Sequence, residues 1–162
     1  MRRIAIVVAA LATFVGLAFA AAPAYAQSGH FITGGGNAPE CTDEGTTVEC
    51  TGKVAGLGGT TFTINIAAAG IASVECTNPG ENVAPGQDTA VDVAGTTGPQ
   101  PTPRNGQAQF TIETDEPAPL PPTPTCPNEM WTATVVDVAC TTATLTLLED
   151  GVVSDTVTVP VS

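Results

Sequence analysis

The chain has 162 residues and a formal net charge of −12, with sixteen acidic residues against four basic ones. Such a charge excludes nucleic acid as a partner, because binding to a phosphate backbone depends on cationic side chains that displace counterions. It also disfavours an anionic membrane surface.

The first 26 residues have the layout of a secretory signal peptide. Two arginines precede an apolar run from residue 4 to 19, and the segment closes with Ala24-Tyr25-Ala26, a pattern typical of signal peptidase sites. Cleavage after Ala26 leaves Lys53 and Arg104 against sixteen acids, a net charge of −14. A retained anchor is the alternative, but the run is short and no stop-transfer charges follow it. We expect a secreted, extracellular product with no membrane insertion after cleavage.

We divide the rest of the chain into a flexible N-terminal segment, residues 27–39, and one domain, residues 40–162. The segment has three consecutive glycines and no sustained periodicity, which is typical of a flexible lead. The domain is large enough to enclose one hydrophobic core.

Alternating apolar and polar residues mark the strands of this domain. The clearest run is residues 60–66, in which Phe62, Ile64 and Ile66 share one face. Further strands are expected at residues 46–54, 71–76, 91–93, 107–113, 130–149 and 152–160, with turns at residues 56–59, 105–106 and 150–151. No stretch has a convincing helical period. The pattern predicts an all-β fold of about eight or nine strands, built as a sandwich.

The stretch Ser73–Thr89 joins a strand that ends at Cys76 to a long loop rich in proline and glycine. A second proline-rich stretch, residues 116–125, is expected to be extended, and it leads directly to Cys126. In an exported chain, cysteines indicate disulfides rather than a metal site. We therefore predict a Cys76–Cys126 bridge that fixes both loops against the domain.

Three cysteines remain. Cys50 and Cys140 each lie in a predicted strand beside an inward valine, so we favour a second bridge between them. Cys41 is then the free thiol, although its pairing with either of the other two stays open.

Calcium is the best-motivated metal hypothesis, because Asn78, Glu81, Asn82 and Asp88 supply oxygen atoms within one loop. Their spacing does not match an EF-hand, and the same residues are ordinary turn formers, so we expect no metal and no cofactor. Paired loop carboxylates could also hydrolyse glycosides, and the candidates by position are Glu81, Asp88, Glu113, Asp115 and Glu116. With sixteen acids on a small domain some lie close by chance, so we expect no catalytic residue.

Three segments resemble parts of small, uncharacterised secreted proteins of actinobacteria. They are GKVAGLG at residues 52–58, CTNPGENVAPGQ at residues 76–87 and CPNEMWTATVVDV at residues 126–138. The resemblance covers most of the chain after residue 26. It implies a single immunoglobulin-like β-sandwich with a Cys76–Cys126 bridge, and it implies no activity or ligand.

The functional hypothesis is a secreted, non-enzymatic interaction module that binds an extracellular protein or a cell-envelope component. The alternative is a small secreted enzyme or enzyme inhibitor that acts through its Pro/Gly-rich loops. The two differ in shape, because an enzyme needs a concave site with convergent polar groups, whereas a module can use a flat face or loop tips.

Overall fold

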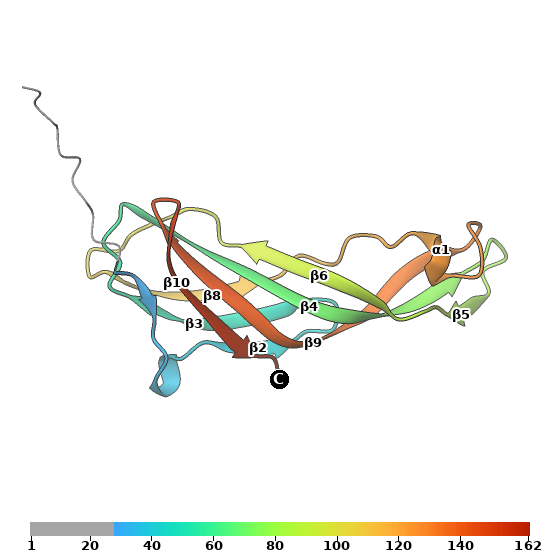
Figure 1. Cartoon of the computed structure of the whole chain (residues 1–162), viewed down its shortest axis with the longest axis horizontal. Coiled ribbons are helices and arrows are strands. Elements are labelled where there is room, and N and C mark those ends of the chain that lie inside the picture. The colour runs from blue at the N-terminus through green and yellow to red at the C-terminus, as the bar shows by residue number, and fades with distance from the viewer. Residues whose placement is uncertain (1–27) are drawn as a thin grey trace, which may run out of the picture.

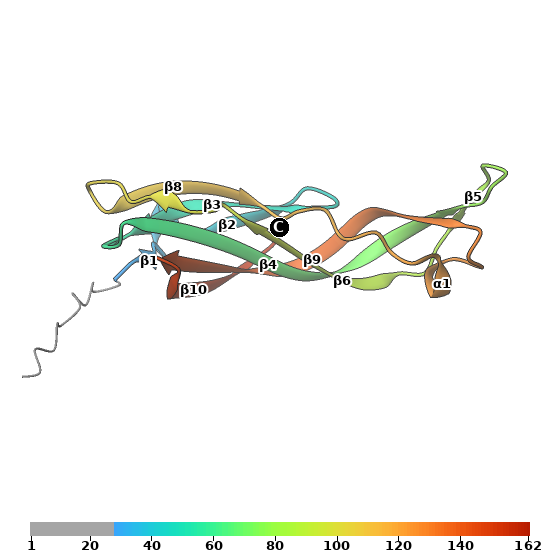
Figure 2. The same cartoon turned by 90° about the horizontal axis from the view of Figure 1, so that it is seen from above.

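The computed structural model describes residues 28–162. The expected signal peptide and Gln27 lie outside the described residues, so cleavage after Ala26 stays a prediction. Two antiparallel sheets pack face to face, and Figure 2 shows them edge-on as two layers. The fold is all-β, as the alternation of residues predicted, and the molecule is elongated (Figure 1).

The smaller sheet contains β1 (His30–Phe31), β2 (Glu40–Asp43), β3 (Val48–Ala55) and β8 (Gln107–Glu113). The larger sheet contains β4 (Thr61–Thr77), β5 (Val83–Pro85), β6 (Thr89–Thr96), β7 (Gln100–Pro101), β9 (Thr132–Glu149) and β10 (Val152–Pro160). The described residues thus form more strands than the eight or nine expected, because β1, β5 and β7 have only two or three residues each.

Strand β3 lies in the middle of the smaller sheet. On one side it pairs with β8, and on the other side it pairs with β2 and then with β1. Strand β4 has the same role in the larger sheet. It pairs with β9 along one side, and β7, β6 and β5 follow one another along its other side, while β10 pairs with the outer side of β9.

Strand β4 is continuous over 17 residues, whereas the sequence predicted two runs, residues 60–66 and 71–76. The alternation continues through the alanines between them, because Ala68 is buried and its neighbours on either side are exposed. Opposite Gly70 the register with β9 is irregular, and a Cβ at Gly70 would lie 2.7 Å from the Sγ of Cys140. Glycine therefore lets the two strands remain paired where a side chain would push them apart.

The core lies between the sheets and is built from the inward residues of both. Its most deeply buried apolar side chains include Val48, Val54, Ile64, Ile66, Val138, Leu145 and Leu147. Burying one side chain of this size contributes about 1.5–3 kcal/mol. These residues come from β3, β4 and β9, so the long strands of the larger sheet contribute most of the core.

The N-terminal segment, residues 27–39, differs from the flexible lead that the sequence predicted. Its described part includes β1 and a short 3-10 helix, η1 (Gly35–Asn37). Phe31 is buried, and its ring contacts Phe110 edge-on with the ring centroids 5.7 Å apart. The Phe31 ring thus packs this segment against the core.

The two long edges of the sandwich are closed in different ways. At one edge the chain leaves β10 and runs parallel to β2, where Ser162 N–H donates to the Cys41 carbonyl (3.1 Å) and Asp43 N–H donates to the Ser162 carbonyl (3.2 Å). At the other edge β6 approaches the end of β8, and Asp115 N–H donates to the Ala94 carbonyl (2.8 Å). Among the backbone hydrogen bonds of residues 28–162, this is the one that joins the second edge.

Glu149, at the end of β9, has a fully buried carboxylate. Its Oε2 accepts a hydrogen bond from Gly29 N–H (2.9 Å), and its Oε1 accepts from Gly58 N–H (2.6 Å) and Gly59 N–H (3.2 Å). A buried charge is tolerated only when such donors replace water. One side chain therefore attaches both the start of the described chain and the β3–β4 turn to the larger sheet.

Replacing Glu149 with glutamine tests this attachment. An amide would place an NH₂ group against one of the three backbone donors, so we expect Glu149→Gln to lower the free energy of unfolding by about 1–3 kcal/mol. Denaturant titration with an unchanged m-value measures the loss. Glu129→Gln, which removes the same charge from an exposed loop, is the matched control, and equal losses for the two variants would contradict the account.

Asp150 and Gly151 form the predicted hairpin turn, with φ angles of 48° and 82° that suit a type I′ turn. The Asp150 carboxylate accepts hydrogen bonds from the Thr60 hydroxyl (2.6 Å), Thr61 N–H (2.9 Å) and Thr60 N–H (3.0 Å). These donors favour the charged form and lower the pKa of Asp150 to about 2.

This pKa predicts a pH dependence of stability. Because the folded pKa lies below the ordinary value of 3.8, the contribution of Asp150 is complete above about pH 4 and is lost as the pH falls towards 2. Asp150→Asn keeps a residue suited to positive φ but cannot be protonated in this range. We expect the difference in melting temperature between wild type and Asp150→Asn to shrink as the pH falls from about 4 to about 2. A difference that stays constant over this window would show that the carboxylate is not held by these donors.

Candidate functional site: the distal arm

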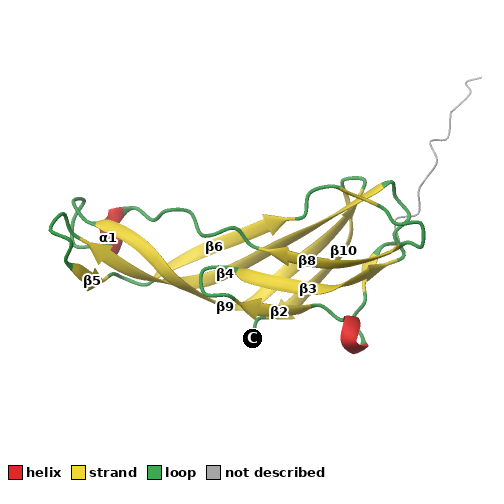
Figure 3. Cartoon of the chain, turned by 180° about the vertical axis from the view of Figure 1, so that it is seen from behind, coloured by secondary structure: helices red, strands yellow, loops and turns green. Residues whose placement is uncertain are grey.

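The ends of β4 and β9 extend beyond the smaller sheet. Strands β3 and β8 have eight and seven residues, whereas β4 and β9 have 17 and 18, so the smaller sheet covers only one part of the larger. We define the distal arm as residues 73–88 and 116–137, which include these strand ends, β5 and a four-residue helix, α1 (Pro122–Thr125). Figure 3 shows the arm projecting from the sandwich.

One face of the arm is covered by chain segments instead of a second sheet. Val74 and Cys76 are buried on this face, and Thr125 and Cys126 are buried with them. The stretch 116–125, predicted as extended, ends here in the single turn of α1. Its end is joined to the loop between β5 and β6, where Gln87 N–H donates to the Thr125 carbonyl (2.9 Å).

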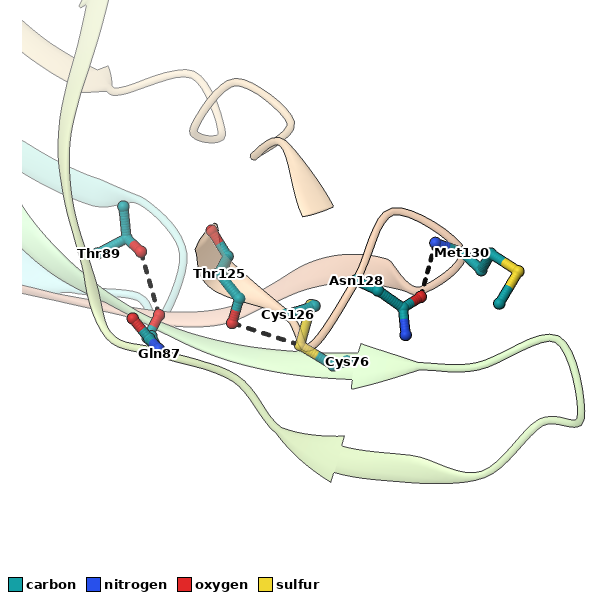
Figure 4. Close-up of a disulfide and its surroundings, with 7 residues drawn as sticks. All are labelled: Cys76, Gln87, Thr89, Thr125, Cys126, Asn128 and Met130. Carbon is teal, nitrogen blue, oxygen red and sulfur yellow. Dashed lines mark hydrogen bonds between the residues drawn. A yellow bond between two sulfur atoms is a disulfide. The ribbon is translucent and has the colours of Figure 1, made fainter. Parts of the chain in front are cut away.

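The predicted Cys76–Cys126 bridge is confirmed. It joins cysteines 50 residues apart, with a Cα–Cα distance of 5.8 Å (Figure 4). The Thr125 carbonyl oxygen lies 3.7 Å from the Cys76 Sγ, a contact and not a hydrogen bond, since a disulfide sulfur carries no proton. A Cβ at Gly86 would lie 2.9 Å from the same sulfur, so the bridge fits only against glycine there.

The second predicted bridge, between Cys50 and Cys140, is wrong. The structure joins Cys41 to Cys50, and Cys140 is the free and buried cysteine. The reason is local, because β2 and β3 form a hairpin in which Cys41 lies directly opposite Cys50 with their Cα atoms 4.1 Å apart. Burial, and then the nearby negative charge of Asp43, raises the pKa of the Cys140 thiol and keeps it protonated.

Two ordered turns lie at the tip of the arm. In the first, the Asn78 Oδ1 accepts from Gly80 N–H (2.9 Å) and from Asn82 N–H (3.0 Å). In the second, the Asn128 Oδ1 accepts from Met130 N–H (3.0 Å), as Figure 4 shows. At both turns a side-chain carbonyl oxygen thus accepts backbone N–H bonds that have no strand partner.

Apolar side chains are displayed beside these turns. Met130 is 72% exposed and Val83 is 59% exposed, while Trp131 is partly buried. Both exposed side chains belong to segments that flank the Cys76–Cys126 bridge.

The calcium candidates do not form a ligand set. The Asn78 oxygen is used by its own turn, and Glu81 and Asn82 belong to that turn, but Asp88 lies beyond β5. Within residues 28–162, no group of three or more His, Cys, Asp or Glu side chains is placed to hold a metal ion.

The described surface has several shallow hollows. Three hollows of about 360, 230 and 340 Å³ are lined mainly by threonine, glutamine, proline and glycine, and the carboxylates that reach them are Glu40 in the first and Glu116 in the second. Two facing carboxylates are therefore not brought together in any of the three. Glu113, another candidate, accepts a hydrogen bond from the Thr47 hydroxyl on the sandwich.

The comparisons with known proteins found no match among protein families, curated proteins or solved structures. Over the described part of the chain, no helix is long and apolar enough to span a membrane. Sequence reasoning singled out the loop after Cys76 but missed the arm itself. The length of the alternation in residues 130–149 is the signal that could have found it, since such a strand exceeds the width of a small sandwich.

The two bridges should contribute unequally to stability. The chain-entropy model assigns about 4 kcal/mol to closing a loop of 50 residues and about 2.5 kcal/mol to a loop of 9. We expect the paired variant Cys76→Ala/Cys126→Ala to lose more stability than Cys41→Ala/Cys50→Ala, measured by denaturant titration. Cys41→Ser, expected to be nearly silent if Cys41 were free, should instead be destabilising. Larger losses from the shorter loop would contradict the role given to the arm's bridge.

Proposed function

We propose that the protein is a secreted, non-enzymatic interaction module that binds an extracellular protein or a cell-envelope component through the tip of its distal arm. The observation that carries the proposal is the exposure of Met130 and Val83 on the disulfide-bridged arm. Binding hot spots are apolar or aromatic anchors on pre-ordered elements, because little conformational entropy is lost when they dock.

The immunoglobulin-like architecture is part of the proposal. The strand order β2–β3–β8 in one sheet and β10–β9–β4–β6 in the other agrees with strands A, B and E facing strands G, F, C and C′ of that sandwich. The chain lacks the usual bridge between the sheets, since Cys50 on β3 pairs within its own sheet. Secretion is also proposed, and two disulfides are consistent with an extracellular location.

The negative charge of the arm indicates what kind of surface a partner would have. The arm has six acidic residues and no basic one, Glu75, Glu81, Asp88, Glu116, Glu129 and Asp137. Lys53 and Arg104, the only basic residues after residue 26, both lie on the sandwich. A partner with a basic rim around an apolar pocket would complement the tip.

An enzyme inhibitor is the second candidate. A convex, disulfide-braced tip can enter the cleft of another enzyme, and the same apolar residues would then make the contact. The enzyme alternative has less support, because none of the three hollows gathers the polar groups that catalysis requires.

A pair of double variants tests the proposal. We expect Val83→Ser/Met130→Ser to abolish capture of a discrete partner from the culture medium or envelope fraction of the producing organism. The matched control is Val152→Ser/Val153→Ser, which alters two valines of 54% and 56% exposure at the β9–β10 hairpin and should leave capture unchanged. Capture should also weaken as salt is raised. If both double variants bind like wild type, the arm tip is not the docking surface.

A further inference from the structure

The largest of the three hollows lies on the smaller sheet, away from the distal arm. Strands β1 and β2 pair with the same side of β3, and residues 33–39 leave the sheet between them as a loop that carries η1. Figure 3 shows this short helix projecting from the smaller sheet. The loop borders a hollow of about 360 Å³ whose other walls come from β2, β3 and β8. This volume falls within the range of small-molecule sites, about 300–1,000 Å³.

Five residues with polar side chains line this hollow, and they are Asn37, Glu40, Thr51, Gln109 and Thr111. Thr51 lies opposite Thr111 in the β3–β8 pair and opposite Glu40 in the β2–β3 pair, so these three form one row across the sheet. Within residues 28–162, none of the five side chains forms a hydrogen bond. Their donors and acceptors are therefore available to a ligand.

Amide side chains elsewhere in the described chain have structural uses. Asn78, Asn105 and Asn128 each accept a hydrogen bond from a backbone N–H of their own turn. The Gln100 amide donates to the Thr97 carbonyl (3.0 Å). The amides of Asn37 and Gln109 have no such use, and both border the same hollow.

The chemistry of the lining indicates a class of ligand. It offers four neutral polar side chains and one carboxylate, and it includes no basic residue, so an anionic ligand is disfavoured on a chain with a net charge of −14 after residue 26. Amide and hydroxyl groups together both donate and accept hydrogen bonds, as the hydroxyls of a sugar do. The Glu40 carboxylate adds a strong acceptor for such hydroxyls. An amine cation would instead need several carboxylates or an exposed aromatic face.

We propose that this hollow binds a neutral sugar unit of a glycan. The amides of Asn37 and Gln109 and the hydroxyls of Thr51 and Thr111 make hydrogen bonds to the sugar hydroxyls. Phe110 also lines the hollow, but it is only 7% exposed, so stacking of the sugar on its ring contributes little. Binding is therefore weak, with a dissociation constant of about 1 mM for one sugar unit. The site is separate from the arm tip and does not depend on docking there.

NMR titration of the chain that starts at Gln27 tests the proposal. The probes are the trimers of glucose, mannose, galactose and N-acetylglucosamine, each added to about 10 mM. We expect at least one trimer to shift the amide signals of residues 36–38, 51–52 and 109–111 and to leave the arm tip unshifted. Because the ligand is neutral, its dissociation constant should be the same at about 0.02 and about 0.5 M salt. No shift with any of the four trimers, or shifts confined to other residues, would overturn the proposal.

Substitutions locate the binding within the molecule. Gln109→Ala and Thr51→Val each remove a hydrogen-bonding group, and each should raise the dissociation constant about fivefold. Gln107→Ala is the matched control, since Gln107 is an exposed glutamine on the same face of β8 but lies outside the hollow. Gln109 also borders the third hollow, whereas Thr51 does not, so a loss in Gln109→Ala alone would contradict the assignment.

A last variant separates this proposal from the proposed function. Val83→Ser/Met130→Ser, which alters the arm tip, should bind the trimer like wild type. Equal binding by Gln107→Ala, Gln109→Ala and Thr51→Val would refute the sugar site and leave docking at the arm tip untouched.

Discussion

The pairing of β4 with β9 is the constraint on which the rest of the molecule depends. The two strands pair from Phe62 to Thr77, far beyond the reach of the smaller sheet. Where the sheets overlap, their inward residues form the core. Where the sheets do not overlap, residues 116–126 pack against the face of the larger sheet instead. Sandwich and arm are therefore two solutions to the burial of one continuous sheet face.

Hydrogen bonds to carboxylates and a disulfide hold the segments that lie outside the β4–β9 pairing. At the sandwich end, the Glu149 and Asp150 carboxylates bind backbone donors of the β3–β4 turn and of Gly29. At the arm end, the Cys76–Cys126 bridge replaces an absent second sheet. The two ends thus have opposite physical character. The sandwich end is held by hydrogen bonds to buried and exposed carboxylates, and the arm end is held by a disulfide.

The sequence predicted the period of most strands, the hairpin turn at Asp150 and the Cys76–Cys126 bridge, because these depend on alternation, turn chemistry and composition. It did not predict which residues meet across strands. The Cys41–Cys50 pair depends on the register of one hairpin, and the ordering of Phe31 depends on a partner almost eighty residues away. The candidate site was missed for the same reason. The length of the alternation in residues 130–149 indicates a long strand, but it does not show that Val83 or Met130 lies beyond the sandwich.

The central claim is that the arm is an ordered extension of the larger sheet and not a pair of loose loops. Hydrogen exchange of the native protein measures this directly at the backbone amides of residues 73–77 and 132–137. The account predicts protection in the arm comparable with that of the sandwich part of β4 and β9, and a large loss of arm protection alone when Cys76 and Cys126 are both replaced by alanine. Arm amides that exchange as fast in the native protein as those of exposed loops would contradict it.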